Sequence, residues 1–339
     1  MKKNIMVIFG GESNEYTVSL RSASAIIKNT DREKYNVYTV GISKSGKFYR
    51  FSGNVSEIES DTWTENKLNE PCVFAGGKLI TVTERIRIDA AILAVHGQNC
   101  EDGKLQGYLF CAKIPYVGCD CQSSAVCMDK AATKDLLRRH NIPMVKYITV
   151  YQNEKDIVER VESYIEYPVF VKPARSGSSV GASVAKSRGE LLTSLGYAFS
   201  VDDKVLVEKF VHAKETEVAI LQISDTNVSV SRVGEIESGG SFYDYDTKYK
   251  KETAKYFIPA RIDGENQRKV RELAKKIFTL LGCSSLARVD FFVGDEIFFN
   301  EINTLPGFTS ISMYPKLLSD TGYSFSDIID RLVMTARIK

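Results

Sequence analysis

The 339-residue sequence lacks a strong excess of either charge, since 45 Lys and Arg residues stand against 43 Asp and Glu residues. This balance gives no molecule-wide field for nucleic acid or for an anionic membrane surface, so we expect neither as a partner. Long apolar runs are also lacking: Ile5–Phe9, the longest early run, is far too short for a secretion signal or a membrane span. We therefore expect a cytoplasmic protein without membrane insertion, whose first apolar run is a buried strand.

Residues that would form a metal cluster with nitrogen or sulfur ligands are few and scattered. The three histidines stand at positions 96, 140 and 212, far apart in the chain. The seven cysteines are an odd number in a long chain without secretory features, so reduced thiols are expected. Cys119 and Cys121 form a C-x-C pair, but no second pair stands at zinc-like spacing. The pattern disfavours a zinc site.

The length exceeds what one hydrophobic core usually supports, so two or three domains are expected. The N-terminal third alternates strand and helix signals, which predicts parallel strands joined by right-handed crossovers. That pattern ends near residues 111–118. We place the domains at 1–117, 118–210 and 211–339. The predicted elements of the first domain are strands at Asn4–Phe9, Tyr35–Ile42 and Ala90–Ala94 and a helix at Ser19–Asn29.

Downstream, the pattern predicts a compact mixed domain followed by a sheet and a long helix. The central elements are helices at Lys130–His140, Asp156–Ile165 and from Arg188, and strands at Met144–Tyr151, Val169–Lys172 and Val205–Phe210. The last third has strands at Thr216–Ile223 and Val228–Ile236, and a helix whose apolar stripe ends at Leu281 before Gly282. Residues 238–256 are polar and long for a passive connection, so we expect them to form a lid.

Two apolar runs in Leu286–Asn303 flank Gly294-Asp295, a pattern typical of a two-residue hairpin. Such a turn places Val293 opposite Glu296. It also places Arg288 opposite Glu301.

Because side chains alternate along a strand, Arg288, Asp290, Glu301 and Asn303 then project from one face. Two carboxylates and an amide oxygen beside an arginine suit Mg²⁺ with a phosphate partner. The alternative is a solvated sheet face that carries an ion pair.

The glycine- and serine-rich segment 172–181 follows an apolar strand. Its small residues would let backbone N–H groups approach a phosphate, and Lys172 would add charge. Read alone, the segment is more often a plain turn, and Lys130 would ordinarily be a surface lysine.

Two acidic residues stand out. Glu208 lies in an apolar strand and needs a donor there, which an adenine amino group could be; the alternative is an edge-strand glutamate paired with a lysine. Glu15 follows the first strand and precedes a helix, where a carboxylate either holds an ammonium group or caps the helix.

These segments, in this order, resemble the D-alanine–D-alanine ligase family, close to its D-alanine–D-serine ligase branch. The resemblance runs almost end to end. It rests on GGESNEYTVSL (10–20), HGQNCEDGKLQG (96–107), MDK (128–130), VKPARSGSSVG (171–181), VEKF (207–210), FYDYDTKY (242–249), ARVDFF (287–292) and NEINTLPGFTS (300–310). It implies the ATP-grasp fold, of α/β (α+β) class, with a parallel-sheet N-terminal domain. ATP would lie between the central and C-terminal domains.

The resemblance also implies roles for particular residues. ATP would be held by Lys130, Lys172, Ser179, Glu208, Lys209, Val211 and Glu215. Asp290, Glu301 and Asn303 would bind two Mg²⁺ ions, with Mn²⁺ as a substitute. Glu15 would hold the ammonium of the first D-alanine, linked through Ser178 and Tyr249 to the lid. Lys248 would meet the transferred phosphate, Arg288 and the Gly307 N–H would stabilise the oxyanion, and Ser312 would hold the second carboxylate.

The chemistry expected of such a site is ligation through an acyl phosphate. A carboxylate is a poor electrophile, so ATP phosphorylates it before a second amine attacks. Water would destroy the intermediate, which is why a closing lid is needed. A homodimer is expected, as is usual in the family.

The sequence departs from the family pattern at Cys100, where a glycine is usual. The Lys248-Tyr249 pair is typical of the peptide-forming members and argues against an ester product. Residues 41–46 resemble the serine-using ligases of vancomycin resistance, whereas Met313 replaces the arginine that those enzymes usually carry. An apolar side chain cannot bond a serine hydroxyl, so we favour D-alanine as the second substrate, with D-serine as the alternative.

Three other classes are weaker. Another ATP-grasp ligase would share the magnesium hairpin but not Glu15 together with the Tyr- and Lys-rich lid. A nicotinamide oxidoreductase would need a dinucleotide glycine spacing after the first strand, which is absent. A non-catalytic nucleotide-binding module would not need the four polar residues of the last hairpin.

Overall fold

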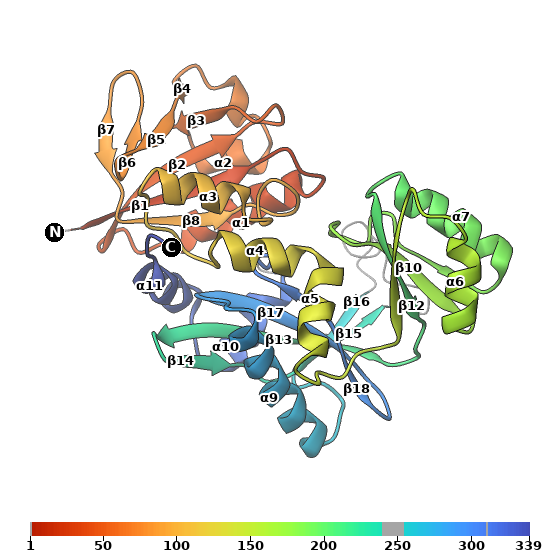
Figure 1. The fold of residues 1–339 in the computed structure, drawn as a ribbon. Helices are drawn as coiled ribbons and strands as arrows, with labels where there is room; N and C mark the ends of the chain where they lie inside the picture. Colours follow the sequence, from red (N-terminus) through yellow and green to blue (C-terminus); the bar gives the residue numbers. More distant parts are fainter. Residues whose placement is uncertain (1, 239–253, 310) are drawn as a thin grey trace.

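A computed structural model describes residues 2–238, 254–309 and 311–339, and Figure 1 shows its fold. We use N-terminal, central and C-terminal domain for residues 1–117, 118–210 and 211–339. The N-terminal domain holds a five-stranded sheet in the order β4-β3-β2-β1-β8. Its strands are β1 (Lys3–Gly10), β2 (Tyr35–Ile42), β3 (Phe48–Phe51), β4 (Glu70–Pro71) and β8 (Ala90–Ala94).

The predicted parallel pairing is confirmed for β1, β2 and β8. The sequence pattern missed β3 and β4, which extend the sheet antiparallel at one edge. Residues Ile5–Phe9 are fully buried, because α1 (Tyr16–Asn29) covers one face of β1 and a second apolar core fills the other. The remaining elements of this domain are α2 (Val55–Glu59), a 3₁₀ turn (Trp63–Glu65), α3 (Lys104–Cys111) and a small sheet of β5 (Val73–Ala75), β6 (Lys78–Ile80) and β7 (Arg85–Arg87).

The central sheet is antiparallel, in the order β11-β10-β12-β9, with α6 and α7 beside it (Figure 1). Helices α4 (Cys121–Met128) and α5 (Lys130–Arg138) precede it and pack elsewhere: Cys127, Leu137 and Ile142 belong to the core of the C-terminal sheet. The pair thus forms a bridge between the two domains. The other elements are β9 (Tyr147–Tyr151), α6 (Ile157–Tyr164), β10 (Val169–Pro173), β11 (Ser183–Ala185), α7 (Arg188–Phe199) and β12 (Lys204–Lys209).

The C-terminal sheet runs β16-β15-β13-β17-β18, with β14 also paired to β13. A single strand over Val228–Ile236 was the wrong prediction, because two strands, β14 and β15, share this segment. The strand is interrupted after Val230, where the Ser231 N–H donates to the Ala219 carbonyl. The strands are β13 (Lys214–Ser224), β14 (Asn227–Val230), β15 (Gly234–Ser238), β16 (Ala254–Phe257), β17 (Leu286–Val293) and β18 (Ile297–Asn303).

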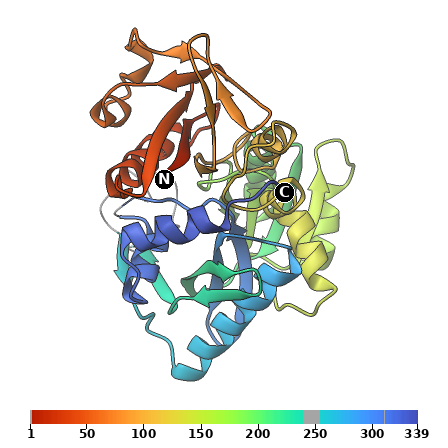
Figure 2. The ribbon, with the colours of Figure 1, turned by 90° about the vertical axis from the view of Figure 1, so that its left-hand side faces the viewer.

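Three described helices complete this domain: α9 (Gly264–Leu280), α10 (Met313–Asp320) and α11 (Phe325–Thr335). Helix α9 begins at the Asp263 cap. The predicted apolar stripe is buried at Val270, Ala274, Ile277 and Leu281 and partly buried at Leu273. Figure 2 shows α11 between the N-terminal domain and the C-terminal sheet. One continuous core joins these two domains, since residues of α1 and β1 pack with residues of β13, α10 and α11. No helix in the described ranges is long and apolar enough to cross a membrane.

Candidate active site

A cavity of about 540 Å³ lies where the three domains meet. Residues from all three line it, and eight of the predicted site residues are among them, whereas Lys172, Glu208 and Asp290 are not. The predicted residues that line the cavity are Glu15, Lys130, Ser178, Arg288, Glu301, Asn303, Gly307 and Ser312. The predicted lid residues Lys248 and Tyr249 lie outside the described residues.

The last hairpin differs from its predicted turn. The pattern predicts a two-residue turn, but Val293 pairs with Ile297, so the loop is three residues, Gly294–Glu296. The Gly294 N–H closes this loop by donating to the Glu296 carbonyl at 3.0 Å. A one-residue change in register turns every later side chain of one strand to the other face of the sheet.

A bulge restores the predicted face. Between Asp290 and Phe291 the register shifts by one residue, so that Asp290 lies opposite Glu301 and Arg288 opposite Asn303. Without the bulge Asp290 would pair with Asn300 and Glu301 would point away. The predicted pairing of Arg288 with Glu301 is therefore wrong, while the predicted common face is confirmed.

The charges on this face are strongly coupled. Arg288 Nε and Nη2 donate to the two oxygens of Asp290 at 2.8 and 2.7 Å, and Nε lies 3.1 Å from Glu217 Oε2. Burial alone would lower the Arg288 pKa, but Asp290 and Glu217 outweigh it and hold that pKa above its usual value. Asp290 is buried and the other three residues of this face are partly buried, so the face carries the ion pair of the alternative interpretation but is not a fully solvated surface.

The donor set on this face fits a hard cation. Carboxylates of Asp290 and Glu301 and the amide oxygen of Asn303 are the oxygen ligands that Mg²⁺ takes, with phosphate oxygens and water completing its shell. Asn303 Oδ1 also accepts the Leu305 N–H at 3.1 Å, which orients its amide oxygen. In the described part of the chain no group of three His, Cys, Asp or Glu residues could hold a metal ion by itself. A magnesium site here thus depends on the amide and on the nucleotide.

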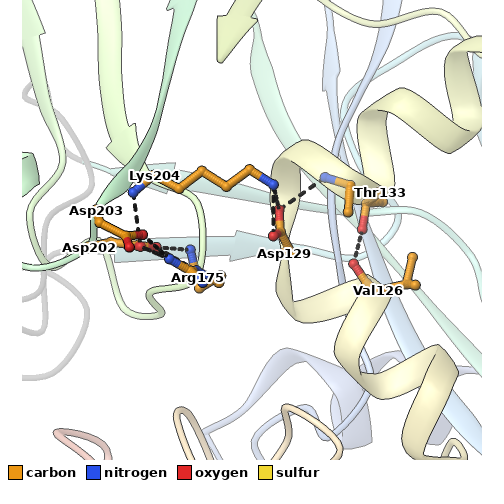
Figure 3. A network of polar contacts seen from close by, with 8 residues as sticks. Val126, Asp129, Thr133, Arg175, Asp202, Asp203 and Lys204 are labelled. Atoms are coloured by element: carbon orange, nitrogen blue, oxygen red, sulfur yellow. Dashed lines mark hydrogen bonds and ion pairs between the residues drawn. The ribbon is translucent and has the colours of Figure 1, made fainter. Parts of the chain in front are cut away.

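Lys130 enters the cavity because the corner between α4 and α5 is held from several sides (Figure 3). Asp129 caps α5 by accepting the Ala132 N–H at 3.0 Å, and Lys204 Nζ binds both of its oxygens at 3.0 and 2.9 Å. The Lys130 N–H donates to the Ala174 carbonyl, and Lys130 Nζ donates to the Ser176 carbonyl at 2.8 Å and lies 3.3 Å from Glu301. With 13% of its side chain exposed, Lys130 is not the ordinary surface lysine of the alternative interpretation.

The glycine-rich loop after β10 is anchored and joins two domains. Arg175 forms ion pairs with Asp202 and Asp203, which lie between α7 and β12 (Figure 3). Ser178 and Ser179 both adopt left-handed backbone angles, with φ of 52° and 58°. Two consecutive left-handed residues are the conformation of a type I′ turn, and this turn brings Ser178 to the cavity lining.

Ser178 connects this loop to the N-terminal domain. Its hydroxyl donates a short hydrogen bond to Glu15, as the resemblance implies. A side chain at Gly177 would collide with Glu15, since an added Cβ would lie 2.7 Å from Glu15 Oε2. Glu15 makes no side-chain cap to α1, which rules out the simple capping interpretation.

Known proteins resemble this chain along nearly its whole length. Models of the D-ala D-ala ligase N-terminus and C-terminus match residues 4–119 and 136–334. A D-alanine–D-alanine ligase of Caldicellulosiruptor bescii is 42% identical, covering 99% of this chain and 95% of the relative. The D-alanine–D-alanine ligase B of Clostridium tetani is also 42% identical, covering 99% and 94%. This chain belongs to the D-alanine–D-alanine ligase family.

Solved structures agree with this assignment. The VanG D-Ala:D-Ser ligase of Enterococcus faecalis matches with a TM-score of 0.91 and 40% identity, covering 99% of each chain. The D-alanine–D-alanine ligase of Coxiella burnetii matches with a TM-score of 0.88 and 31% identity, covering 98% and 93%. The predicted ATP-grasp fold is confirmed, and the protein is an ATP-dependent ligase of this family.

In this ligase Glu208 lies in an internal strand, since β12 pairs with both β10 and β9. The alternative of an edge-strand glutamate is therefore wrong, although lysines do pair with it. Lys134 Nζ lies 2.9 Å from Oε1 and Lys172 Nζ 2.9 Å from Oε2. Burial alone would raise the Glu208 pKa, and the two lysines outweigh it and lower that pKa. Lys209 ends β12, Val211 lies in the connection and Glu215 lies in β13, while Ser179 follows Ser178. None of these four residues lines the cavity.

The ligase also holds its 304–309 segment with residues that we did not predict from the sequence. His96 Nδ1 lies 2.9 Å from the Leu305 carbonyl, and Nε2 lies 3.0 Å from Ser22 Oγ. Ser22 Oγ in turn accepts the Phe308 N–H at 3.2 Å. Burial lowers the His96 pKa, so the ring is neutral. A carbonyl only accepts, so Nδ1 carries the proton and Nε2 accepts from Ser22.

Cys100 does not disturb the turn in which the family has a glycine. Positive φ angles there fall on Gly97, Asn99 and Gly103, and Cys100 has none. Its thiol fills the space above Gly11, where an added Cβ would lie 2.5 Å from Cys100 Sγ. The other sequence feature, the C-x-C pair, splits between a buried Cys119 and an exposed Cys121.

Glu101, from the same turn, is a further cavity residue. It lines the cavity, and one of its buried oxygens has no hydrogen-bond partner in the described structure. Burial, with the nearby Glu15 charge, raises the pKa of Glu101 to about 8. The sequence feature that could have identified Glu101 is its position within the family motif at residues 96–103.

Proposed function

We propose that this enzyme ligates two D-amino acids through an acyl phosphate, with D-alanine as both substrates and two Mg²⁺ ions, for peptidoglycan precursor synthesis. The observation that carries the proposal is the cavity at the domain junction. There the polar face of the last hairpin, Lys130 and the Glu15–Ser178 pair come together from three domains. Phosphate, carboxylate and ammonium groups would all find partners of opposite charge in this cavity.

The first steps concern the nucleotide and the first substrate. Lys130 and Lys172 neutralise the phosphates of ATP, and Glu15 holds the ammonium of the first D-alanine. Asp290, Glu301 and Asn303 would hold the magnesium ions, which when bound would neutralise charge on the transferred phosphate. Near-complete burial of Asp290 keeps water away from this part of the site.

The second half of the reaction concerns the incoming amine. Arg288 and the Gly307 N–H would stabilise the oxyanion formed when that amine attacks the acyl phosphate, and such donors contribute a few kcal/mol each. Ser312 lies at the start of α10, and its Oγ is 2.7 Å from Thr309 Oγ1. An added Cβ at Gly307 would lie 2.9 Å from Ser312 Oγ, so Gly307 and Ser312 face the same space. That space suits the carboxylate of the second substrate.

Met313 supports D-alanine over D-serine. It lines the cavity beside Ser312, it is 4% exposed, and a Cβ built at Gly234 would lie 3.1 Å from its sulfur. A thioether offers a substrate hydroxyl only a weak hydrogen-bond acceptor. The second candidate is D-alanine–D-serine ligation, which the likeness to the VanG D-Ala:D-Ser ligase favours.

The test measures phosphate release from ATP with D-alanine alone, with D-alanine plus D-serine, and with L-alanine, and identifies the dipeptide by mass. We expect turnover with D-alanine alone and D-alanyl-D-alanine as the main product of the mixture. Predominant D-alanyl-D-serine would transfer the assignment to the second candidate. Equal turnover with L-alanine, or none with D-alanine, would contradict both.

We also propose that the enzyme is a cytoplasmic homodimer. Four large apolar side chains of the N-terminal domain are strongly exposed: Leu68 at 68%, Val73 at 55%, Val82 at 87% and Phe110 at 43%. Burial of these side chains by a second copy would remove apolar area from water. Sedimentation velocity would show a species of twice the monomer mass, and a monomer at all concentrations would contradict the dimer.

A further inference from the structure

Lys134 is a buried lysine that neither the sequence pattern nor the family resemblance led us to select. It lies on α5, four residues after Lys130 and on the same helix face. Its side chain is fully buried, and Nζ is 2.9 Å from Glu208 Oε1. The rings of Tyr147 and Phe299 lie 5.5 and 5.9 Å from this ammonium. A cation in such a place needs a permanent counter-charge.

Glu208 forms ion pairs with two lysines, and the surroundings of these two side chains differ. Lys172 Nζ bonds Glu208 Oε2 and also reaches Asn300 Oδ1 at 3.2 Å, at the start of the metal-binding end of β18. In the proposed function Lys172 neutralises a phosphate of ATP and therefore turns from Glu208 when ATP binds. Lys134 is fully buried beside two aromatic rings, and among the described residues its one ion pair is with Glu208. When Lys172 turns away, Lys134 is the cation that stays with Glu208.

We propose that Lys134 is a positioning residue for nucleotide recognition: it holds the Glu208 carboxylate charged and oriented as a hydrogen-bond acceptor for the exocyclic amine of adenine. This inference rests on the proposed function, in which Glu208 meets the base. A charged Glu208 carboxylate accepts hydrogen bonds only, so it selects a purine that carries a hydrogen-bond donor where adenine has its exocyclic amine. A base with a carbonyl oxygen there, such as hypoxanthine, would face a carboxylate that cannot donate to it.

The test compares Lys134→Met, Glu208→Gln and the double variant with the wild type, and uses ATP and ITP as probes. Without Lys134 the hydrogen bond from adenine to the Glu208 carboxylate should be lost. Losing one charge-assisted hydrogen bond weakens binding roughly tenfold, so Lys134→Met should raise the KM for ATP about tenfold. We expect kcat and KM for D-alanine to stay within about threefold, and the preference for ATP over ITP to fall. In the double variant the KM for ATP should equal that of Glu208→Gln alone, because Lys134 acts only through Glu208.

The control is Lys339→Met, which removes another mostly buried lysine whose Nζ donates to Ser284 Oγ at 2.9 Å, away from the cavity. It should leave both the KM for ATP and the ATP preference unchanged. An unchanged KM for ATP in folded Lys134→Met would overturn the inference. If Lys134→Met does not fold, the double variant is used instead, because it removes both charges together. A KM for ATP of the double variant above that of Glu208→Gln would overturn the inference, and an equal KM supports it. Absence of D-alanine-dependent turnover in the wild type would instead overturn the proposed function.

Discussion

Removing the Ser22 hydroxyl should loosen the segment that carries Gly307 without touching any substrate. Ser22 is fully buried on α1, 286 residues away from Phe308, whose N–H it accepts. Its own proton goes to His96 Nε2, and His96 Nδ1 holds the Leu305 carbonyl. The variant Ser22→Ala therefore breaks the link between the N-terminal domain and residues 305–308 at its middle member.

The expected size follows from the groups that lose a partner. In Ser22→Ala the Phe308 N–H and the His96 Nε2 lone pair are both left buried, and each such group costs about 1–3 kcal/mol. We expect a loss of about 2–6 kcal/mol in the free energy of unfolding, seen as a fall in Tm of several degrees. Because a small misplacement of a catalytic segment is costly, kcat/KM for D-alanine should fall about tenfold or more, with KM for ATP unchanged.

The matched control is Ser231→Ala. Ser231 is also fully buried, and its hydroxyl likewise accepts one backbone N–H, that of Ala219 at 2.9 Å, and donates to the Arg232 carbonyl at 2.6 Å. It should lose similar stability while its kinetics stay close to wild type at a temperature at which all variants are folded. If Ser22→Ala shows the same kinetics as Ser231→Ala, the link is merely structural and the reasoning is refuted.

Three further outcomes are expected. The pKa of Glu101, raised to about 8 by burial, means that the native state keeps a proton that the unfolded chain releases from about pH 4.5 upward. The contribution of this group to the free energy of unfolding is therefore fully present below about pH 4.5 and is lost as the pH rises through 8. The Tm of Glu101→Gln relative to that of the wild type should therefore rise between about pH 5 and pH 8.5. A difference in Tm that stays constant with pH would contradict this. Asp290→Ala should lower D-alanine-dependent phosphate release at least about 100-fold and raise the Mg²⁺ requirement, whereas Asp295→Ala, on the exposed turn of the same hairpin, should not; equal activities would disprove the metal assignment. Met313→Arg should raise the share of D-serine in the products about tenfold over Met313→Leu when both amino acids are supplied, and an unchanged product ratio would exclude Met313 as the determinant.

Much of the fold could be predicted from local patterns. The strands at Tyr35–Ile42 and Ala90–Ala94 lie at the predicted residues, and the continuous apolar run of the second strand is buried on both faces. The elements β3, β4 and the small β5–β7 sheet were missed because they have two to four residues each and carry no clear periodicity. The split of 228–236 into β14 and β15 was missed because both halves read as strand.

The last hairpin shows why a partly wrong prediction still found the right face. Its turn is one residue longer than predicted, which alone would have moved Glu301 away from Asp290. The bulge at Asp290 adds a compensating residue, so the alternation of side chains was preserved where it matters. A sequence pattern reports parity along a strand but cannot count the residues in a turn.

The sequence by itself determined the polar face of β17 and β18, the short side chains of the loop after β10 and the acid that precedes α1, because strand periodicity and backbone space are local properties. The family motifs then assigned chemistry to those residues. Only the tertiary structure decided that Lys134 is buried against Glu208 and that Ser22 reaches Phe308 through 286 intervening residues. A lysine or a serine has the same helical periodicity whether it faces water or a buried partner. The partner is chosen by how the three domains pack.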